Sequence, residues 1–306
     1  MSLHWPKSRI IPVRQRPIRG VIFSQERANF RSNPGNSSGF NFAYATTAHE
    51  TAHQWWAGRV AAPAGPGDAL LTESLAKYTE AVVTEKRFGK MYLRPYHVKD
   101  SQLYFAYRSA ASEKELPLWQ TVNQPFVYYQ KGGLALFRLK EALGEAHMTR
   151  ALHELVERYG YPARKPGPPT VVDALKRGAN AAQIRLIDEL FKKVIVFDND
   201  IKILSSKPLS NNRQLLVLEI NVRKTDETSG KPVPVTPDDD IDIAVFDREI
   251  VPDTAPPDPV YLQRHHFSKR RSVVTMAVPR TAMTVVLDPL STMPDINYHD
   301  NSATLK

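Results

Sequence analysis

The chain has 306 residues, a formal net charge of +9 and no cysteine. A chain of this length can bury a sizeable core and usually forms two domains or one large one. Without cysteine it has no disulfide bond, thiolate ligand or cysteine nucleophile, so a transition metal must be bound by His and carboxylate side chains. No apolar run approaches the roughly 20 residues that span a bilayer, and the sequence as given therefore predicts a soluble chain.

The positive charge raises the question of a nucleic-acid partner. The Lys and Arg residues are scattered, and their densest cluster, HHFSKRRS at 265–272, lies between strand-like runs. We interpret this cluster as a solvated loop. Nucleic-acid binding would rest on composition alone, and we expect no such partner.

The first predicted element is an amphipathic helix that carries the stretch TTAHETAHQWWAGRV, residues 46–60. His49 and His53 are four residues apart, so on an α-helix they point the same way and lie roughly 6 Å apart along the axis. Together they can bind one metal ion. Glu50, about 100° around the helix, can reach a metal-bound water without ligating the metal itself. The motif alone leaves open an ordinary pair of surface or core histidines.

More helices follow, each with apolar residues at helical spacing before a glycine that stops it. The three stretches are 71–82 before Gly89, 136–143 before Gly144, and 152–159 before Gly160. The proline-rich segment 162–170 cannot continue a helix, so it predicts a loop that leads to a short helix capped by Thr170. A last helix over 181–194 closes this part of the chain.

Near residue 197 the helical spacing gives way to strand alternation, which we interpret as a domain boundary. Leu216, Leu218, Ile220 and Val222 fall on one face of a half-buried strand. Further strands are predicted at 241–246, 272–278 and 283–288, separated by turns as a β-sandwich requires. The predicted fold class is therefore α+β, with a mostly helical domain over residues 1–196 and a β-sandwich over residues 197–306.

A third metal ligand is expected on the second helix, because a catalytic zinc takes three protein ligands and leaves a position for water. Glu73, in LLTESLAKYTE, lies in the first turns of that helix, and Gly and Pro residues before it let the chain turn back. The alternative is an ordinary carboxylate that the dipole favours at a helix N-terminus.

In these motifs the sequence resembles the gluzincin metallopeptidases of the aminopeptidase N type. Their thermolysin-like domain carries HExxH, followed by a Glu ligand in a NEGFA motif on the next helix. HETAHQWW matches closely, including the Trp pair, and TESLAKY stands where NEGFAxY would be. The resemblance implies that His49, His53 and Glu73 bind Zn²⁺ and that Glu50 is the general base.

Two departures from the family pattern concern the second motif. Nineteen residues separate His53 from Glu73, one more than in the common pattern. Thr72, Ser74 and Leu75 replace Asn, Gly and Phe. The extra residue falls in a Pro/Gly loop that can absorb it.

The family also places a tyrosine two residues before a Lys-Gly pair at the start of a later helix. FVYYQKGGLALFRL has this pattern and puts the catalytic tyrosine at Tyr129, with Tyr128 as its neighbour. The resemblance implies that the Tyr129 hydroxyl donates to the oxyanion of the tetrahedral intermediate. An ordinary aromatic residue at a helix start is the alternative.

Within the family, the sequence is similar to a bacterial subgroup in which this domain follows the membrane-spanning segments of ABC-type permeases. The strings TESLA and DPLSTMPDINYHDN carry this similarity. It implies a membrane-associated parent protein whose permease portion is a partner of this domain, on an unassigned side of the membrane. The family's large N-terminal β-domain is absent, which fits either a fragment, truncated in the N-terminal part of the peptidase domain, or a divergent architecture.

One family motif is missing from the sequence. Aminopeptidases of this family carry a GxMEN strand whose Glu holds the free α-amino group of the substrate, and no such string occurs. The segment 20–30, GVIFSQERANF, stands in about the right place and offers Gln25 or Glu26 as a substitute. We take Glu26 as the candidate substrate-binding residue, and exopeptidase specificity stays open.

The resemblance implies zinc-dependent hydrolysis of a peptide substrate, with aminopeptidase-like activity. Zinc lowers the pKa of its bound water toward ~7, Glu50 takes the proton and passes it to the leaving amine, and Tyr129 stabilises the oxyanion. The alternative is a non-catalytic peptide-binding or sensing module of a membrane transport assembly that retains the zinc fold. The missing GxMEN motif favours that alternative, whereas the intact Glu50 and Tyr129 argue against it.

Overall fold

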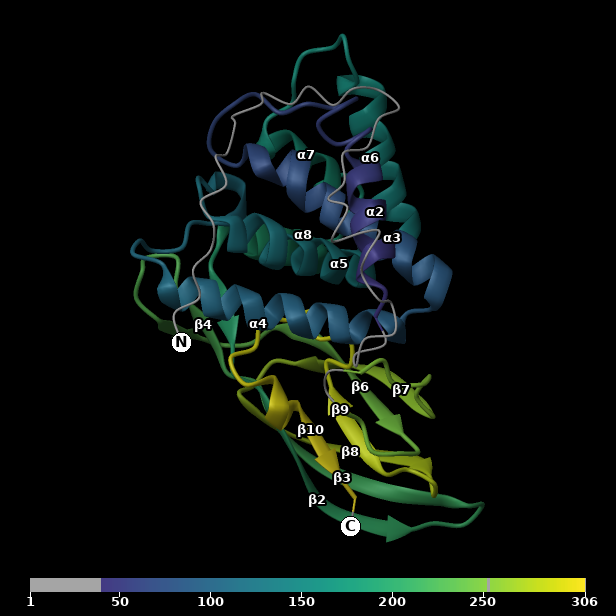
Figure 1. Cartoon of the computed structure of the whole chain (residues 1–306). Coiled ribbons are helices and arrows are strands. Elements are labelled where there is room, and N and C mark those ends of the chain that lie inside the picture. Colours follow the sequence, from purple (N-terminus) through teal and green to yellow (C-terminus); the bar gives the residue numbers. More distant parts are fainter. Residues whose placement is uncertain (1–39, 252–253, 306) are drawn as a thin grey trace, which may run out of the picture.

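The computed structural model describes residues 40–251 and 254–305. Its helices gather in one half of the molecule and its strands in the other (Figure 1). The helix α4 (Arg94–Ala110) lies along the border between the two halves. This border is where the zinc-motif part of the chain meets the strand-rich part.

The helical half begins with α2 (Phe42–Ala52), which carries the two histidines. Its other helices are α3 (Leu75–Phe88), α4, α5 (Gly132–Leu143), α6 (Glu145–Tyr159), α7 (Pro168–Lys176) and α8 (Ala181–Lys192). Gly89 and Gly144 end α3 and α5 with φ angles of 94° and 86°, which residues with a Cβ rarely adopt. The predicted stops at these two glycines are confirmed. None of the helices in the described ranges has the length and apolar composition of a membrane span.

Wide π-helical turns lead into two of these helices. The turn η1 (Leu70–Ser74) precedes α3, and η4 (Phe126–Lys131) precedes α5. Such turns are rare and occur frequently at functional sites. The remaining short helices are 3₁₀ turns: η2 (Met91–Leu93), η3 (Leu118–Gln120) and η5 (Tyr298–Asn301).

Two helices differ from the sequence-based expectation. Helix α7 begins at Pro168 instead of after Thr170, because proline fits the first turn, where its missing N–H has no intrahelical partner. Helix α4 has no clear apolar periodicity, since polar side chains such as Asp100 and Ser101 are buried on it beside apolar ones. The apolar pattern alone therefore does not predict α4.

The strand-rich half consists of antiparallel sheets. Two larger sheets have the strand orders β10-β9-β6-β7 and β2-β3-β8, and a small one has the order β1-β4-β5. The strands predicted at 216–222, 241–246, 272–278 and 283–288 correspond to β3, β6, β8 and β9. The strand bounds are β1 (Ile195–Phe197), β2 (Asp200–Pro208), β3 (Arg213–Asn221), β4 (Lys224–Asp226), β5 (Val233–Val235), β6 (Asp239–Phe246), β7 (Tyr261–Phe267), β8 (Arg271–Pro279), β9 (Thr284–Leu287) and β10 (Ser302–Thr304).

The two larger sheets enclose one apolar core. Leu218 and Ile220 of β3 lie in the same buried cluster as Ile243 of β6 and Val285 of β9. This packing of two sheets makes a sandwich, and the predicted α+β class, a helical part followed by a β-sandwich, is confirmed.

The solvated loop predicted over 265–272 is shorter than expected. His265, His266 and Phe267 belong to β7, and β8 begins at Arg271. Only residues 268–270 connect the two strands, because the pairing of β7 with β6 extends through Phe267.

A shared apolar cluster joins the helical half to the sandwich. It contains Ala81 and Phe137 from the helices together with Phe246 and Val286 from β6 and β9. The helical half therefore packs on the sandwich and is not merely tethered to it. The division into domains at residues 196 and 197 stays a prediction, since β1 spans that point.

Candidate metal centre and catalytic residues

Helix α2 presents His49 and His53 on one face. Asn41 caps the helix by accepting a hydrogen bond from the Tyr44 backbone N–H (2.9 Å). The helix ends at Ala52, yet His53 keeps helical dihedrals as its C-cap (φ −61°, ψ −13°). The two imidazole rings consequently stay on the same side, with centroids 4.8 Å apart.

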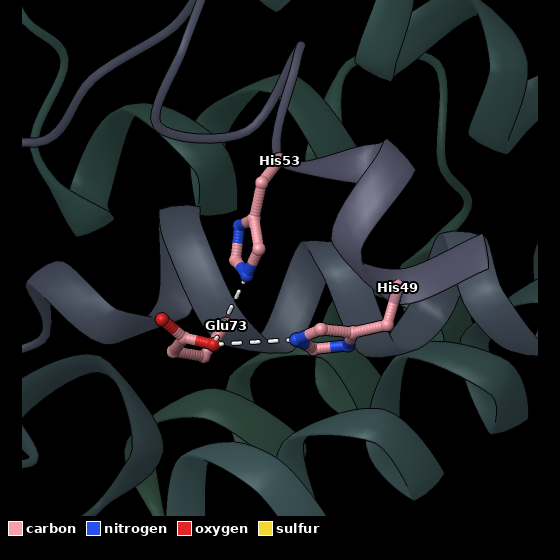
Figure 2. Close-up of side chains that lie close together, drawn as sticks. All are labelled: His49, His53 and Glu73. Carbon is pink, nitrogen blue, oxygen red and sulfur yellow. Dashed lines mark ion pairs between the residues drawn. The ribbon is translucent and has the colours of Figure 1, made fainter. Parts of the chain in front are cut away.

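Glu73, on the π-helical turn η1, completes the group. Its Oε2 atom lies 3.5 Å from His49 Nε2 and 3.5 Å from His53 Nε2. Figure 2 shows both histidine rings pointing at this one oxygen, which belongs to a neighbouring element of the chain. The same oxygen is buried and has no hydrogen-bond partner within bonding distance.

These three side chains fit a zinc ion. Zinc is bound tetrahedrally by His nitrogen and carboxylate oxygen at about 2.0–2.2 Å, which places neighbouring ligand atoms about 3.3 Å apart. The two 3.5 Å separations agree with that spacing, and the three ligand atoms all lie within 4.8 Å of one another. A buried carboxylate oxygen without a hydrogen bond is costly unless a cation neutralises it. In the described part of the chain, no other group of three or more His, Asp or Glu side chains meets this spacing.

Opposite charges face each other in this group of side chains. Burial alone would lower the pKa of His49, but its contacts with Glu73 and Glu80 raise that pKa to about 9. Burial would raise the pKa of Glu73, but the close approach of His49 and His53 lowers it to about 2. The site therefore holds Glu73 as a carboxylate, which is the form that ligates a metal.

The rear of each imidazole ring is held by a hydrogen bond. His49 Nδ1 donates to Glu80 Oε2 (3.2 Å), and His53 Nδ1 donates to the Trp56 carbonyl (3.1 Å). Each bond leaves Nε2 free to face a metal ion, which is the arrangement that metal-binding histidines usually have. Glu80, which supports the candidate ligand His49, is a residue that we do not predict from the sequence. Its position, two helical turns after Glu73 on the same face, is the signal that identifies it.

Tyr129 lies beside the same centre, on η4. Its ring centroid is 6.1 Å from that of His49. Burial, followed by the charge of Glu73 and a hydrogen bond with it, raises the pKa of Tyr129, and Glu50 adds to the rise. The phenol therefore stays protonated and able to donate. Tyr128 lies next to it, with ring centroids 5.0 Å apart.

Glu50 follows His49 on α2 and is half-buried. Its negative charge adds to the rise in the pKa of Tyr129, so the two side chains are near enough to interact through space. The predicted substrate-binding residue Glu26 and its alternative Gln25 lie outside the described residues.

Comparison with known proteins agrees with this geometry. The family model described as "Peptidase family M1 domain" matches residues 20–193, which is more than half of the chain. That range includes α2, η1 and η4, and therefore the histidines, Glu73 and Tyr129. No curated protein matches the chain. The chain belongs to peptidase family M1.

Proposed function

We propose that the chain is a zinc-dependent peptidase in which His49, His53 and Glu73 bind the metal. The observation that carries the proposal is the convergence of both Nε2 atoms on the buried, unbonded Oε2 of Glu73. Membership of family M1 supports peptide hydrolysis as the reaction.

Zinc, when bound, supplies a Lewis acid that polarises the scissile carbonyl and acidifies water. Glu50 is the general base: it takes a proton from the attacking water while the new C–O bond forms. The Tyr129 hydroxyl donates a hydrogen bond to the oxygen that becomes negative, and the raised pKa of Tyr129 keeps this donor protonated. Glu50 then delivers its proton to the amine nitrogen as the C–N bond breaks.

The finer specificity is part of the same proposal. We take the activity to be aminopeptidase-like, with Glu26 holding the free amino group of the substrate. The similarity of TESLA and DPLSTMPDINYHDN to the permease-fused subgroup supports a membrane-associated parent protein.

Metal content and peptide cleavage, measured together on the wild type and Glu50→Gln, test this function. We expect one zinc per chain in both proteins, and cleavage by the wild type alone. A panel of amino-acyl and internally quenched peptides distinguishes an exopeptidase from an endopeptidase. Full cleavage by the variant would exclude Glu50 as the base. Bound zinc without any cleavage by the wild type would favour a non-catalytic binding or sensing module.

A further inference from the structure

A buried ion pair lies directly behind the residue that supports His49. Lys77 of α3 and Asp100 of α4 approach within 3.2 Å, and their exposed fractions are only 9% and 4%. Lys77 Nζ also lies 3.6 Å from Glu80 Oε2, the oxygen that accepts from His49. The pair therefore continues the contacts of the metal centre inward, from α2 through α3 to α4.

Tyr96 completes this buried cluster. Its hydroxyl donates to the other oxygen of Glu80, at 2.6 Å, and accepts a hydrogen bond from Lys77. Both oxygens of Glu80 are thus engaged, one by His49 and one by Tyr96. Lys77 is thus a cation beside the carboxylate that accepts from His49, a candidate zinc ligand.

The candidate ligand Glu73 and the charged groups behind it carry a net negative charge, which favours a divalent cation. Glu73, Glu80 and Asp100 are buried or half-buried carboxylates, and Lys77 is a buried ammonium. With both histidines neutral, as metal ligands must be, three negative charges and one positive charge leave a net charge of −2. Without Asp100, the charge of Lys77 would act on Glu80 uncompensated and the net charge would fall to −1.

We propose that Lys77 and Asp100 are positioning residues of the metal centre, in which Asp100 neutralises Lys77 so that Glu80 keeps its full strength as the acceptor of His49. This inference rests on the proposed zinc site and assigns it an inner supporting pair. If the pair served stability alone, its replacement would leave the metal affinity unchanged. Buried ion pairs often contribute little net stability, so a change in metal affinity is the more informative measurement.

The test compares the dissociation constant of zinc in four folded proteins by competition with a chelator, at pH 8. Burial raises the pKa of Asp100 to about 6, so this carboxyl is ionised at that pH. The proteins are the wild type, Asp100→Asn, the charge-balanced double variant Lys77→Met/Asp100→Asn, and the control Asp200→Asn. Asp200 is another buried aspartate and is paired with Arg223 (2.7 Å), in the sandwich.

We expect Asp100→Asn to weaken zinc binding about tenfold, the lower end of the effect seen for residues that support metal ligands. The double variant should return to within about twofold of the wild type, since it restores the net charge of −2. Asp200→Asn should not change zinc affinity. If Asp100→Asn does not fold, Asp100→Ser takes its place and should show the same tenfold loss. The corresponding double variant, Lys77→Met/Asp100→Ser, should then show the same recovery.

Equal zinc affinity in Asp100→Asn and the wild type, or a double variant as weak as the single one, would overturn the inference. Either result would leave the peptidase proposal intact if the wild type cleaves peptides. Conversely, tight zinc binding by the wild type without cleavage would overturn the peptidase proposal and leave the inference intact. A wild type that binds no zinc would overturn both.

Discussion

At the scale of single residues, the orientation of His49 depends on Glu80. The imidazole has two nitrogens, and only a fixed tautomer presents Nε2 as a lone pair toward the metal. Glu80 fixes it by accepting the Nδ1 proton, and Tyr96 holds Glu80 in turn. Because Glu80 is 5% exposed, water cannot readily take over its role.

Replacing Glu80 with Gln should therefore weaken zinc binding while the fold is retained. Gln can still contact Tyr96, but it lacks the negative charge that strengthens His49 as a ligand. We expect a 10- to 100-fold rise in the zinc dissociation constant. A chelator competition titration measures it, with Glu85→Gln as the control, since Glu85 pairs with Lys140 on α5 instead of with the metal centre. An unchanged dissociation constant in Glu80→Gln would contradict this role.

Tyr129 and Tyr128 offer a matched pair for testing the oxyanion donor. Tyr129→Phe removes only the hydroxyl, so zinc content should not change, while kcat should fall about 10²- to 10³-fold. Tyr128→Phe should affect kcat much less, because it is the Tyr129 ring that lies beside the ring of His49, with centroids 6.1 Å apart. Steady-state kinetics on one peptide substrate decide between them. The reverse ranking of the two variants would move the catalytic role to Tyr128.

The sequence predicts these site residues better than it predicts their support. Spacing within a single helix is enough to pair His49 with His53, and the family motifs add Glu73 and Tyr129. Lys77, Tyr96 and Asp100 escape prediction because their roles arise from contacts between α3 and α4, which no periodicity encodes. Because lysine is rarely buried in proteins, a sequence-based prediction places Lys77 on the surface.

At the scale of elements, the centre depends on contact between the π-helical turns η1 and η4. Ser74 Oγ of η1 donates to the Tyr128 carbonyl of η4, at 2.6 Å. Gly132, which follows η4, allows this approach, since a Cβ there would lie 2.3 Å from Ser74 Oγ. The two turns carry Glu73 and Tyr129, so this contact sets the distance between the proposed metal ligand and the proposed oxyanion donor.

Gly132→Ala should therefore disturb the candidate metal centre, although Gly132 is not one of its residues. We expect a loss of about 1–3 kcal/mol in the free energy of unfolding, which is typical of overpacking, together with lower peptidase activity. Denaturant unfolding and steady-state kinetics measure the two effects. Ser74→Gly removes the side chain that clashes and also its hydrogen bond to Tyr128, so it is the reference for the double variant Ser74→Gly/Gly132→Ala. The double variant should be about as stable as Ser74→Gly alone. A further loss of about 1–3 kcal/mol on adding Gly132→Ala to Ser74→Gly would show that the clash lies elsewhere.

The elements themselves divide into those that a pattern can reveal and those that it cannot. Strand β3 and helix α8 have one apolar face each, and their periodicity predicts them. The N-terminal half of α4 is buried between the helical half and the sandwich and carries polar side chains inward. Arg94 and His97 donate hydrogen bonds to the carbonyls of Pro289 and Leu290, nearly 200 positions later in the sequence. Buried polar contacts of this kind remove the apolar stripe on which helix prediction depends.

At the scale of the whole molecule, a buried ionic cluster supplements the apolar junction between the two halves. Asp239, at the start of β6, accepts from Arg138 of α5 at 2.9 Å and from Lys224 of β4 at 3.0 Å. Lys224 also contacts Glu189 of α8 at 2.7 Å.

The α+β class follows from the sequence because it depends on local periodicity. This junction does not, because it joins positions about a hundred residues apart.

Asp239 should make the attachment of the two halves sensitive to acid. Burial would raise the pKa of Asp239, but the charges of Arg138 and Lys224 lower it. A carboxyl whose pKa is lower in the folded state contributes stability above its unfolded pKa, about 3.9, and loses that contribution as the pH falls through the folded value.

We therefore expect Asp239→Asn to reduce the free energy of unfolding by about 3 kcal/mol at pH 7, because it leaves two buried cations partly uncompensated. Below about pH 4, the difference between the wild type and the variant should shrink as Asp239 itself takes up a proton. Denaturant unfolding of both proteins between pH 7 and pH 3 measures this difference, and the subtraction cancels the titration of groups that the two proteins share. A difference that stays constant down to pH 3 would mean that the charge of Asp239 does not hold the halves together. The zinc dissociation constant of folded Asp239→Asn should equal that of the wild type, since Asp239 does not contact the metal centre.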